Sequence, residues 1–189
     1  MKTTFNLLGC CLFCFILTNA CSNSVSSNTQ KATASYFSLQ QFFNDEAQRL
    51  QKNNTKLEKV ITLNENEETK TISNIDWQKE LALFKEADLN KPSWYDQYRI
   101  DSTQQNQELH ISYTALNDKL RTKSVQLIFS NNNNYPHLIK IARNTNNLLY
   151  NLEEQYSYRS NEGYHIKSHQ KIMGLNPSTF EIKGNYLKP

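Results

Sequence analysis

The chain has 189 residues, of which 38% are hydrophobic, 11% aromatic and 21% charged, and its formal net charge is +3. This apolar content is too high for a disordered chain and is sufficient for one domain with a packed core. The basic residues are scattered among acidic ones, so the clustered positive charge of a nucleic-acid-binding protein is absent and no nucleic-acid partner is expected.

Residues 1–20 have the pattern of a secretory signal peptide. Lys2 is followed by an apolar run from Phe5 to Leu17 that contains one strongly polar side chain, Asn6. A membrane-spanning helix needs about 20 apolar residues to cross about 30 Å of hydrocarbon, and this run is shorter and ends at small polar residues. We therefore expect cleavage after this segment and not a membrane span.

The cysteine at the end of this segment indicates lipidation. Residues LTNAC, ending at Cys21, resemble the bacterial lipoprotein signal, although Thr18 stands where leucine is usual; the same residues also fit an ordinary cleavage site. The other three cysteines lie inside the segment that would be removed, so Cys21 is the only cysteine of the mature chain and no intramolecular disulfide is possible. Acylation of Cys21 with palmitate-type chains would account for this single thiol.

Residues 21–35 are expected to be the acylated cysteine and a flexible tether. After Cys21 the chain is rich in serine, threonine and asparagine, a composition typical of a solvated linker. Fourteen such residues reach about 20 Å, at about 5–6 Å times the square root of their number. Two or more acyl chains give stable anchoring. The membrane is thus the first expected partner, through a lipid anchor at Cys21.

Residues 36–189 are expected to form a single α+β domain that begins with two amphipathic helices. Ser38 has the pattern of a helix cap, and apolar residues follow it at helical spacing. A second helix is predicted from Trp77, after the cap Asp76, and must stop before Pro92. The residues at helical spacing are Leu39, Phe42, Phe43, Ala47 and Leu50 in the first helix, and Trp77, Leu81, Phe84 and Asp88, with Leu83 and Ala87 beside them, in the second.

The rest of the domain has the period-two pattern of strands. A hairpin is predicted over residues 57–73, around an asparagine-rich turn, and alternating strands over residues 109–115 and 125–129. Further runs, LIKIAR, NLLYNLEEQYSYR, YHIKSHQKIM and TFEIKGNYL, are separated by turn signals. Short connections allow only antiparallel pairing. The predicted fold is two N-terminal helices packed on a curved antiparallel β-meander, an open half-barrel-like sheet.

Several stretches resemble a known family. WQKELALFKEADLNKPSW, followed by ISYTALNDKLRTKSV, NLLY and GYHIKSHQKI, is similar to a family of outer-membrane lipoproteins of unknown function from the Bacteroidota. The resemblance covers most of residues 36–187 and implies a lipoprotein with a helix-plus-sheet domain, but no activity. In lipoproteins of this group, surface export reads acidic residues just after the acylated cysteine, and here the first acid is Asp45. The resemblance therefore implies the outer membrane, with the domain facing the periplasm.

No catalytic, metal or cofactor site is expected. Four glycines are too few for a phosphate-binding loop or a nucleophile elbow. On a helix, the spacing in HIKSH would bring two histidines to one metal ion. On the predicted strand, four residues separate His165 from His169 by about 13 Å, which is too far for a shared ion. We interpret His165, Lys167, His169 and Lys171 as a solvated basic strip. Glu153 and Glu154 are neighbours on a predicted strand and should point to opposite faces, and Glu80, Glu86 and Asp88 should lie on the polar side or at the end of the second helix. The remaining candidates are His110 and His137, and no acid–base pair is expected among these residues.

Three functions remain open at this point. The first is a non-enzymatic cell-envelope lipoprotein that binds an apolar small molecule or an envelope protein, because ten tyrosines and nine phenylalanines are more aromatic surface than two helices need. The second is a periplasmic hydrolase-type enzyme whose site is gathered by the fold. The third is an assembly role through an exposed sheet edge. Similarly, EADLNKP (residues 86–92) is either a recognition loop or a helix end stopped by Pro92.

The lipid anchor can be tested by changing Cys21→Ser. We expect the variant to fold, because the core lies after residue 36, but to leave the membrane, because the acyl chains supply the anchoring. Fractionation of cells followed by a salt wash measures this. A variant that stays in the membrane pellet would contradict lipidation as the anchor.

Overall fold

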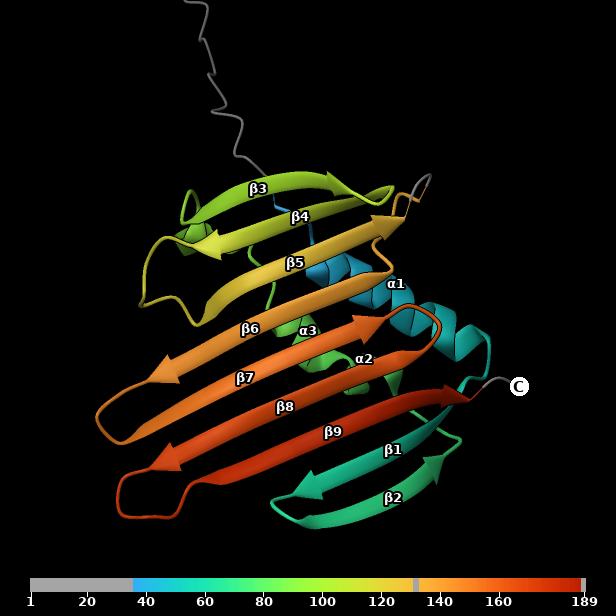
Figure 1. Cartoon of the computed structure of the whole chain (residues 1–189). Helices are drawn as coiled ribbons and strands as arrows, with labels where there is room; N and C mark the ends of the chain where they lie inside the picture. The colour runs from blue at the N-terminus through green and yellow to red at the C-terminus, as the bar shows by residue number, and fades with distance from the viewer. Residues whose placement is uncertain (1–35, 131–132, 188–189) are drawn as a thin grey trace, which may run out of the picture. The chain divides into compact units, whose positions relative to one another are not determined.

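The computed structural model describes residues 36–130 and 133–187, which form a nine-stranded antiparallel sheet with helices on one face (Figure 1). The order of the strands across the sheet is β2-β1-β9-β8-β7-β6-β5-β4-β3. The expected signal peptide, the lipidation residue Cys21 and the tether lie outside the described residues.

The elements have the following bounds. The helices are α1 (Leu39–Lys52), α2 (Trp77–Glu80), α3 (Ala82–Glu86) and the 3-10 helix η1 (Pro92–Trp94). The strands are β1 (Lys56–Leu63), β2 (Asn66–Ile72), β3 (Tyr98–Gln105), β4 (Glu108–Ala115), β5 (Thr122–Ser130), β6 (Leu138–Asn146), β7 (Tyr150–Arg159), β8 (Gly163–Ile172) and β9 (Ser178–Leu187). None of these helices is long and apolar enough to cross a membrane, within the residues that the structure describes.

The predicted antiparallel sheet is confirmed, with two differences. Strand β3 was not predicted, because all its residues after Tyr98 are exposed at the sheet edge and do not alternate in polarity. The hairpin β1–β2 does not stand alone: β1 pairs with β9, from Lys56 opposite Leu187 to Leu63 opposite Phe180. The first and last strands of the described chain are therefore neighbours.

Helix α1 begins at Leu39 because two side chains accept its free N–H groups. The Ser38 hydroxyl accepts from the Gln41 N–H at 3.1 Å. The buried Asp88 carboxylate accepts from the Gln40 N–H at 2.8 Å and from the Ser38 hydroxyl at 3.2 Å. Asp88 therefore caps α1 from another part of the chain, which gives EADLNKP a structural role.

The second predicted helix is two short helices. Leu81 ends α2 and precedes α3 with φ −93° and ψ 10°, outside ideal helical geometry, yet its N–H still donates to the Trp77 carbonyl at 3.1 Å. The predicted apolar stripe is preserved across this break, since Trp77, Leu81 and Phe84 are all buried. Trp77 contacts Tyr186 of β9 and Phe84 contacts Tyr156 of β7, so both short helices pack on the sheet.

Aromatic rings fill the interface between the helices and the sheet. Phe43 of α1 lies with its ring centroid 4.9 Å from Phe84 of α3 and 5.0 Å from Tyr158 of β7. Phe84 also contacts Tyr156 and Tyr164, at 5.5 and 5.9 Å. Much of the aromatic content that motivated an apolar ligand therefore packs in the core.

Two buried tyrosines tie helices to the sheet through glutamates. The Tyr158 hydroxyl donates to Glu46 of α1, which also forms an ion pair with Arg49 at 2.8 Å. The Tyr164 hydroxyl donates to Glu80 of α2, which pairs with Lys59 of β1 at 2.7 Å.

The sequence predicted that Glu80 lies on the solvated side of a helix. This prediction is wrong, because Glu80 lies between α2 and the sheet. The ring of Tyr164 also needs Gly184 beneath it, because a Cβ there would lie 2.4 Å from the ring.

The buried tyrosines predict a loss of stability at high pH. Burial is the largest cause that raises the pKa of six of them: Tyr98, Tyr113, Tyr156, Tyr158, Tyr164 and Tyr186. Unfolded tyrosines lose their protons near pH 10, so above that pH the unfolded state binds fewer protons than the folded state. The free energy of unfolding should therefore be unaffected below about pH 9 and fall above pH 10, by about 1.4 kcal/mol per pH unit for each tyrosine still protonated in the fold.

Tyrosinate absorbance and circular dichroism followed together across an alkaline titration would measure this. We expect the absorbance change of the six buried tyrosines to coincide with the loss of circular dichroism in one cooperative step. Ionisation of all ten tyrosines in a sheet that is still folded would contradict it.

Candidate functional site

The open face of the sheet, the side opposite α1, α2 and α3, carries polar side chains. In β8, Tyr164 and Ile166 point to the helices, so His165 and Lys167 point away from them, as the alternation predicted. Ser157 of β7 and Lys183 of β9 lie directly opposite His165 on the neighbouring strands. This face is free of helices in the described part of the chain (Figure 1).

Two adjoining hollows lie near the centre of the open face. The larger, of about 430 Å³, spans β5 to β8 and the smaller, of about 300 Å³, spans β7 to β9. Both are lined by Ser157 and His165, which therefore stand between them. The other polar side chains that line them include Ser124, Gln126, Lys140, Gln155 and Lys167 in the larger and Arg159, Glu162, Lys183 and Asn185 in the smaller.

A histidine–glutamate pair lies beside these hollows. His165 Nε2 is 2.8 Å from Glu181 Oε1, and Lys183 Nζ is 3.0 Å from the same oxygen. The hydrogen bond from Lys183 lowers the pKa of the Glu181 carboxyl, and the one from His165 acts in the same direction. Glu181 is thus held as a carboxylate, and the ammonium group of Lys183 balances its charge. Lys140 and Lys167 make no ion pair with a described residue, and no carboxylate lines the larger hollow with them, so this hollow has excess positive charge.

A second group of polar side chains lies where β4 and β5 approach the start of β6. The Glu108 carboxylate lies between two histidines, with His110 Nε2 at 3.4 Å and His137 Nε2 at 3.3 Å. The other ring nitrogen of His137, Nδ1, is 3.1 Å from the Ser130 hydroxyl. His137 therefore links a hydroxyl to a carboxylate, an arrangement that the sequence did not indicate because residues far apart along the chain form it.

The two histidines of HIKSH do not meet. His165 pairs with Glu181, whereas His169 Nδ1 is 3.3 Å from the Thr179 hydroxyl. Within residues 36–130 and 133–187, no group of three or more histidine, cysteine, aspartate or glutamate side chains is placed to hold a metal ion.

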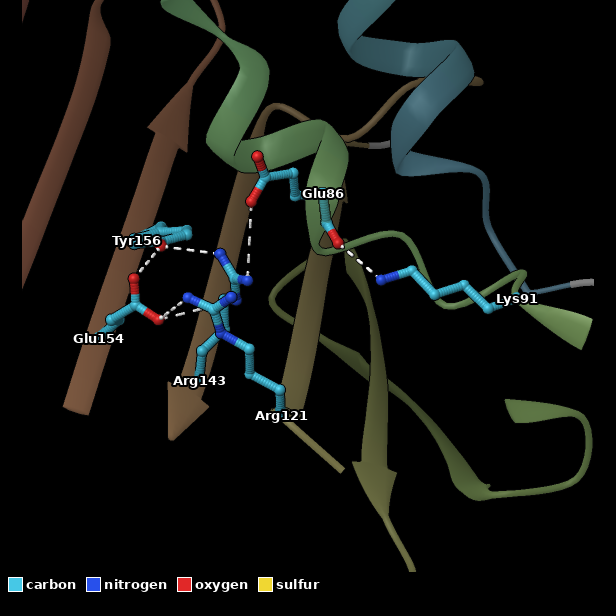
Figure 2. Close-up of polar contacts among 6 residues, drawn as sticks. All are labelled: Glu86, Lys91, Arg121, Arg143, Glu154 and Tyr156. Carbon is cyan, nitrogen blue, oxygen red and sulfur yellow. Dashed lines mark hydrogen bonds and ion pairs between the residues drawn. The ribbon is translucent and has the colours of Figure 1, made fainter. Parts of the chain in front are cut away.

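A buried charged cluster lies on the other face, at the end of α3 (Figure 2). This Arg143 cluster consists of Glu86, Lys91, Arg121, Arg143, Glu154 and Tyr156. Arg143 of β6 lies opposite Glu154 of β7, and the Arg143 side chain is 3% exposed. Tyr156 donates to Glu154 Oε1 at 2.6 Å and accepts from Arg143 Nη1 at 2.9 Å. Burial is the largest cause of the raised pKa of Tyr156, so its hydroxyl keeps its proton for Glu154.

The other members lie on the solvent-exposed side of the cluster. Arg121 Nη2 is 3.0 Å from Glu154 Oε2, and the Arg121 side chain is 44% exposed. Glu86 Oε2 is 3.9 Å from Arg143 Nη2, and the Glu86 side chain is 57% exposed. Lys91 donates to the backbone carbonyl of Glu86 at 3.0 Å. Its pKa is lowered by burial and next by Arg143, while Asp88 and Glu86 act in the opposite direction.

The prediction that Glu153 and Glu154 point to opposite faces of a strand is confirmed. The Arg143 cluster was not predicted from the sequence. Glu153 is exposed, whereas Glu154 faces the helices. A signal was present in β6, where Arg143 continues the alternation of the buried residues Ile139 and Ile141. A charged residue in register with an apolar face indicates a buried ion pair.

The cluster predicts unequal effects for two adjacent glutamates. Changing Glu154→Ala leaves Arg143 without its nearest buried counter-charge and Tyr156 without an acceptor, so we expect a loss of about 3–5 kcal/mol in the free energy of unfolding. The matched control Glu153→Ala should change it by less than about 0.5 kcal/mol, because that side chain is exposed. Urea denaturation measures both. Equal effects would contradict the structural role of Glu154.

Comparisons with protein-family models, with curated proteins and with solved structures found no match. The functional assignment therefore depends on the geometry of the described residues and on the sequence.

Proposed function

We propose that the chain is a non-enzymatic cell-envelope lipoprotein that binds a partner protein through the open face of its sheet. The observation that carries this is the distribution of side chains on the two faces. The helix-covered face is filled by packed aromatic rings, whereas the open face has hollows of about 430 Å³ and 300 Å³ lined by hydrogen-bonding groups. Such a surface suits a polar partner better than an apolar small molecule.

The charges that line the larger hollow favour an acidic partner surface. Lys140 and Lys167 line the larger hollow without an ion pair to a described residue, and the charge of Glu181 is balanced by Lys183. A partner that presents carboxylates would gain faster association and a defined orientation from this charge.

The position in the cell follows from the sequence and is part of the proposal. An acyl anchor at Cys21 in the outer membrane and a tether over residues 21–35 would hold the domain in the periplasm. A sheet curved as an open half-barrel, filled on its inner side by α1, α2 and α3, would leave its other side to face the partner.

A photo-crosslinking amino acid tests this surface. Introduced at Gln155, which lines the larger hollow, it should yield an adduct of higher mass in native cells, and at the exposed Gln48 of α1 it should not. The charge reversals Lys140→Glu and Lys167→Glu should reduce the adduct at Gln155. Equal adducts at Gln155 and Gln48, or an adduct that the charge reversals leave unchanged, would contradict the proposal.

A hydrolase is the second candidate function, and one observation favours it. His137 contacts the Ser130 hydroxyl at 3.1 Å and the Glu108 carboxylate at 3.3 Å, so an imidazole joins a hydroxyl to a carboxylate. A fluorophosphonate probe that labels the chain but not Ser130→Ala would establish this function. No labelling would leave the binding function as proposed.

A further inference from the structure

The guanidinium of Arg143 is buried but makes few hydrogen bonds. It has five N–H donors. Among the described residues it forms one hydrogen bond, from Nη1 to the Tyr156 hydroxyl at 2.9 Å. Nε has no hydrogen-bond partner. Buried polar groups in proteins are nearly always hydrogen-bonded, so donors left over in a buried arginine point to a further acceptor.

Two of the four remaining donors lie on one edge of the guanidinium. Nε and Nη2 share that edge, and each has a carboxylate oxygen 3.9 Å away, Glu154 Oε2 for Nε and Glu86 Oε2 for Nη2. These distances exceed the 2.7–3.2 Å range of an N–H···O hydrogen bond. The same edge matches two oxygens of one carboxylate or phosphate group.

The two carboxylates differ in how firmly they are held. Glu154 is buried and receives hydrogen bonds from Tyr156 at 2.6 Å and from Arg121 at 3.0 Å. Glu86 has a 57% exposed side chain at the end of α3 and reaches Arg143 at 3.9 Å only. Glu86 can therefore turn to solvent without breaking a hydrogen bond, whereas Glu154 cannot.

The charge balance favours an anion in the place of Glu86. Without Glu86, the cluster has two arginines, the buried Arg143 and the partly exposed Arg121, against one carboxylate, Glu154. Lys91 adds a further positive charge beside the end of α3, where Figure 2 shows it reaching the Glu86 backbone. A carboxylate would balance the excess charge of the two arginines over Glu154, and a dianionic phosphate would balance that of Lys91 as well.

We propose that the Nε–Nη2 edge of Arg143, together with Arg121, binds one oxyanionic group of a ligand, a carboxylate or a phosphate, in exchange for the Glu86 side chain. This site is separate from the open face and goes beyond the function proposed above. It lies at the end of α3, on the helix-covered side.

Nuclear magnetic resonance of the full-length chain tests this site directly. The Arg143 Nε–H resonance, identified by its loss in Arg143→Lys, should shift saturably when acetate or inorganic phosphate is added at constant ionic strength in chloride. The probe that binds more tightly identifies carboxylate or phosphate as the preferred group. No saturable shift with either probe would overturn the proposal.

Variants at exposed positions keep the test independent of folding, since Arg143→Lys itself can unfold the chain. Glu86→Gln removes the competing carboxylate and should tighten binding by up to about fivefold, the factor that an exposed ion pair of about 1 kcal/mol represents. Arg121→Gln should weaken it, whereas Arg99→Gln, an exposed arginine of β3 paired with Asp101, should not. Equal affinity in Glu86→Gln, Arg121→Gln and the unchanged chain would overturn the proposal.

Discussion

The hydroxyl groups of Tyr156, Tyr158 and Tyr164 lie between the helices and the sheet, and each requires an acceptor because its ring is buried in the core. Three glutamates meet this requirement, and each is in turn paired with a basic residue. Two of these glutamates, Glu46 and Glu80, come from helices. The position of α1 and α2 on the sheet is therefore specified by hydrogen bonds as well as by apolar packing, which alone tolerates sliding.

The third of these arrangements differs from the other two in its balance of donors and acceptors. Glu46 and Glu80 each receive a tyrosine hydroxyl and one basic side chain, Arg49 or Lys59. At Glu154 a buried guanidinium, that of Arg143, is added. Among the described residues, the only other carboxylate that forms an ion pair with this guanidinium is the exposed Glu86. The arrangement of tyrosine, glutamate and basic residue at Glu154 thus leaves N–H donors of Arg143 without a hydrogen-bond acceptor. These donors are the candidate for ligand recognition.

Local patterns predicted much of the fold, but not how distant segments combine. The cap at Ser38, the stripe on α1 and the alternation in β4 and β5 depend on neighbouring residues and are visible in the sequence. The edge strand β3 lacks alternation, and the pairing of β1 with β9 joins residues more than a hundred positions apart. The candidate sites have the same property, since the Arg143 cluster and the His137 contacts assemble across strands whose register no local pattern encodes.

The pairing of β1 with β9 has a consequence for the time at which the chain can fold. Strands β1 and β2 emerge early from the ribosome, but β1 has no partner besides β2 until the last strand, β9, has been synthesised. A two-stranded hairpin alone is at best marginally stable in water, and contacts between distant segments form slowly because a long loop must close first. The N-terminal part of the domain therefore stays unfolded during most of synthesis. For a chain exported in extended form, as the proposed lipoprotein would be, this delay keeps the polypeptide competent to cross the inner membrane before the sheet forms.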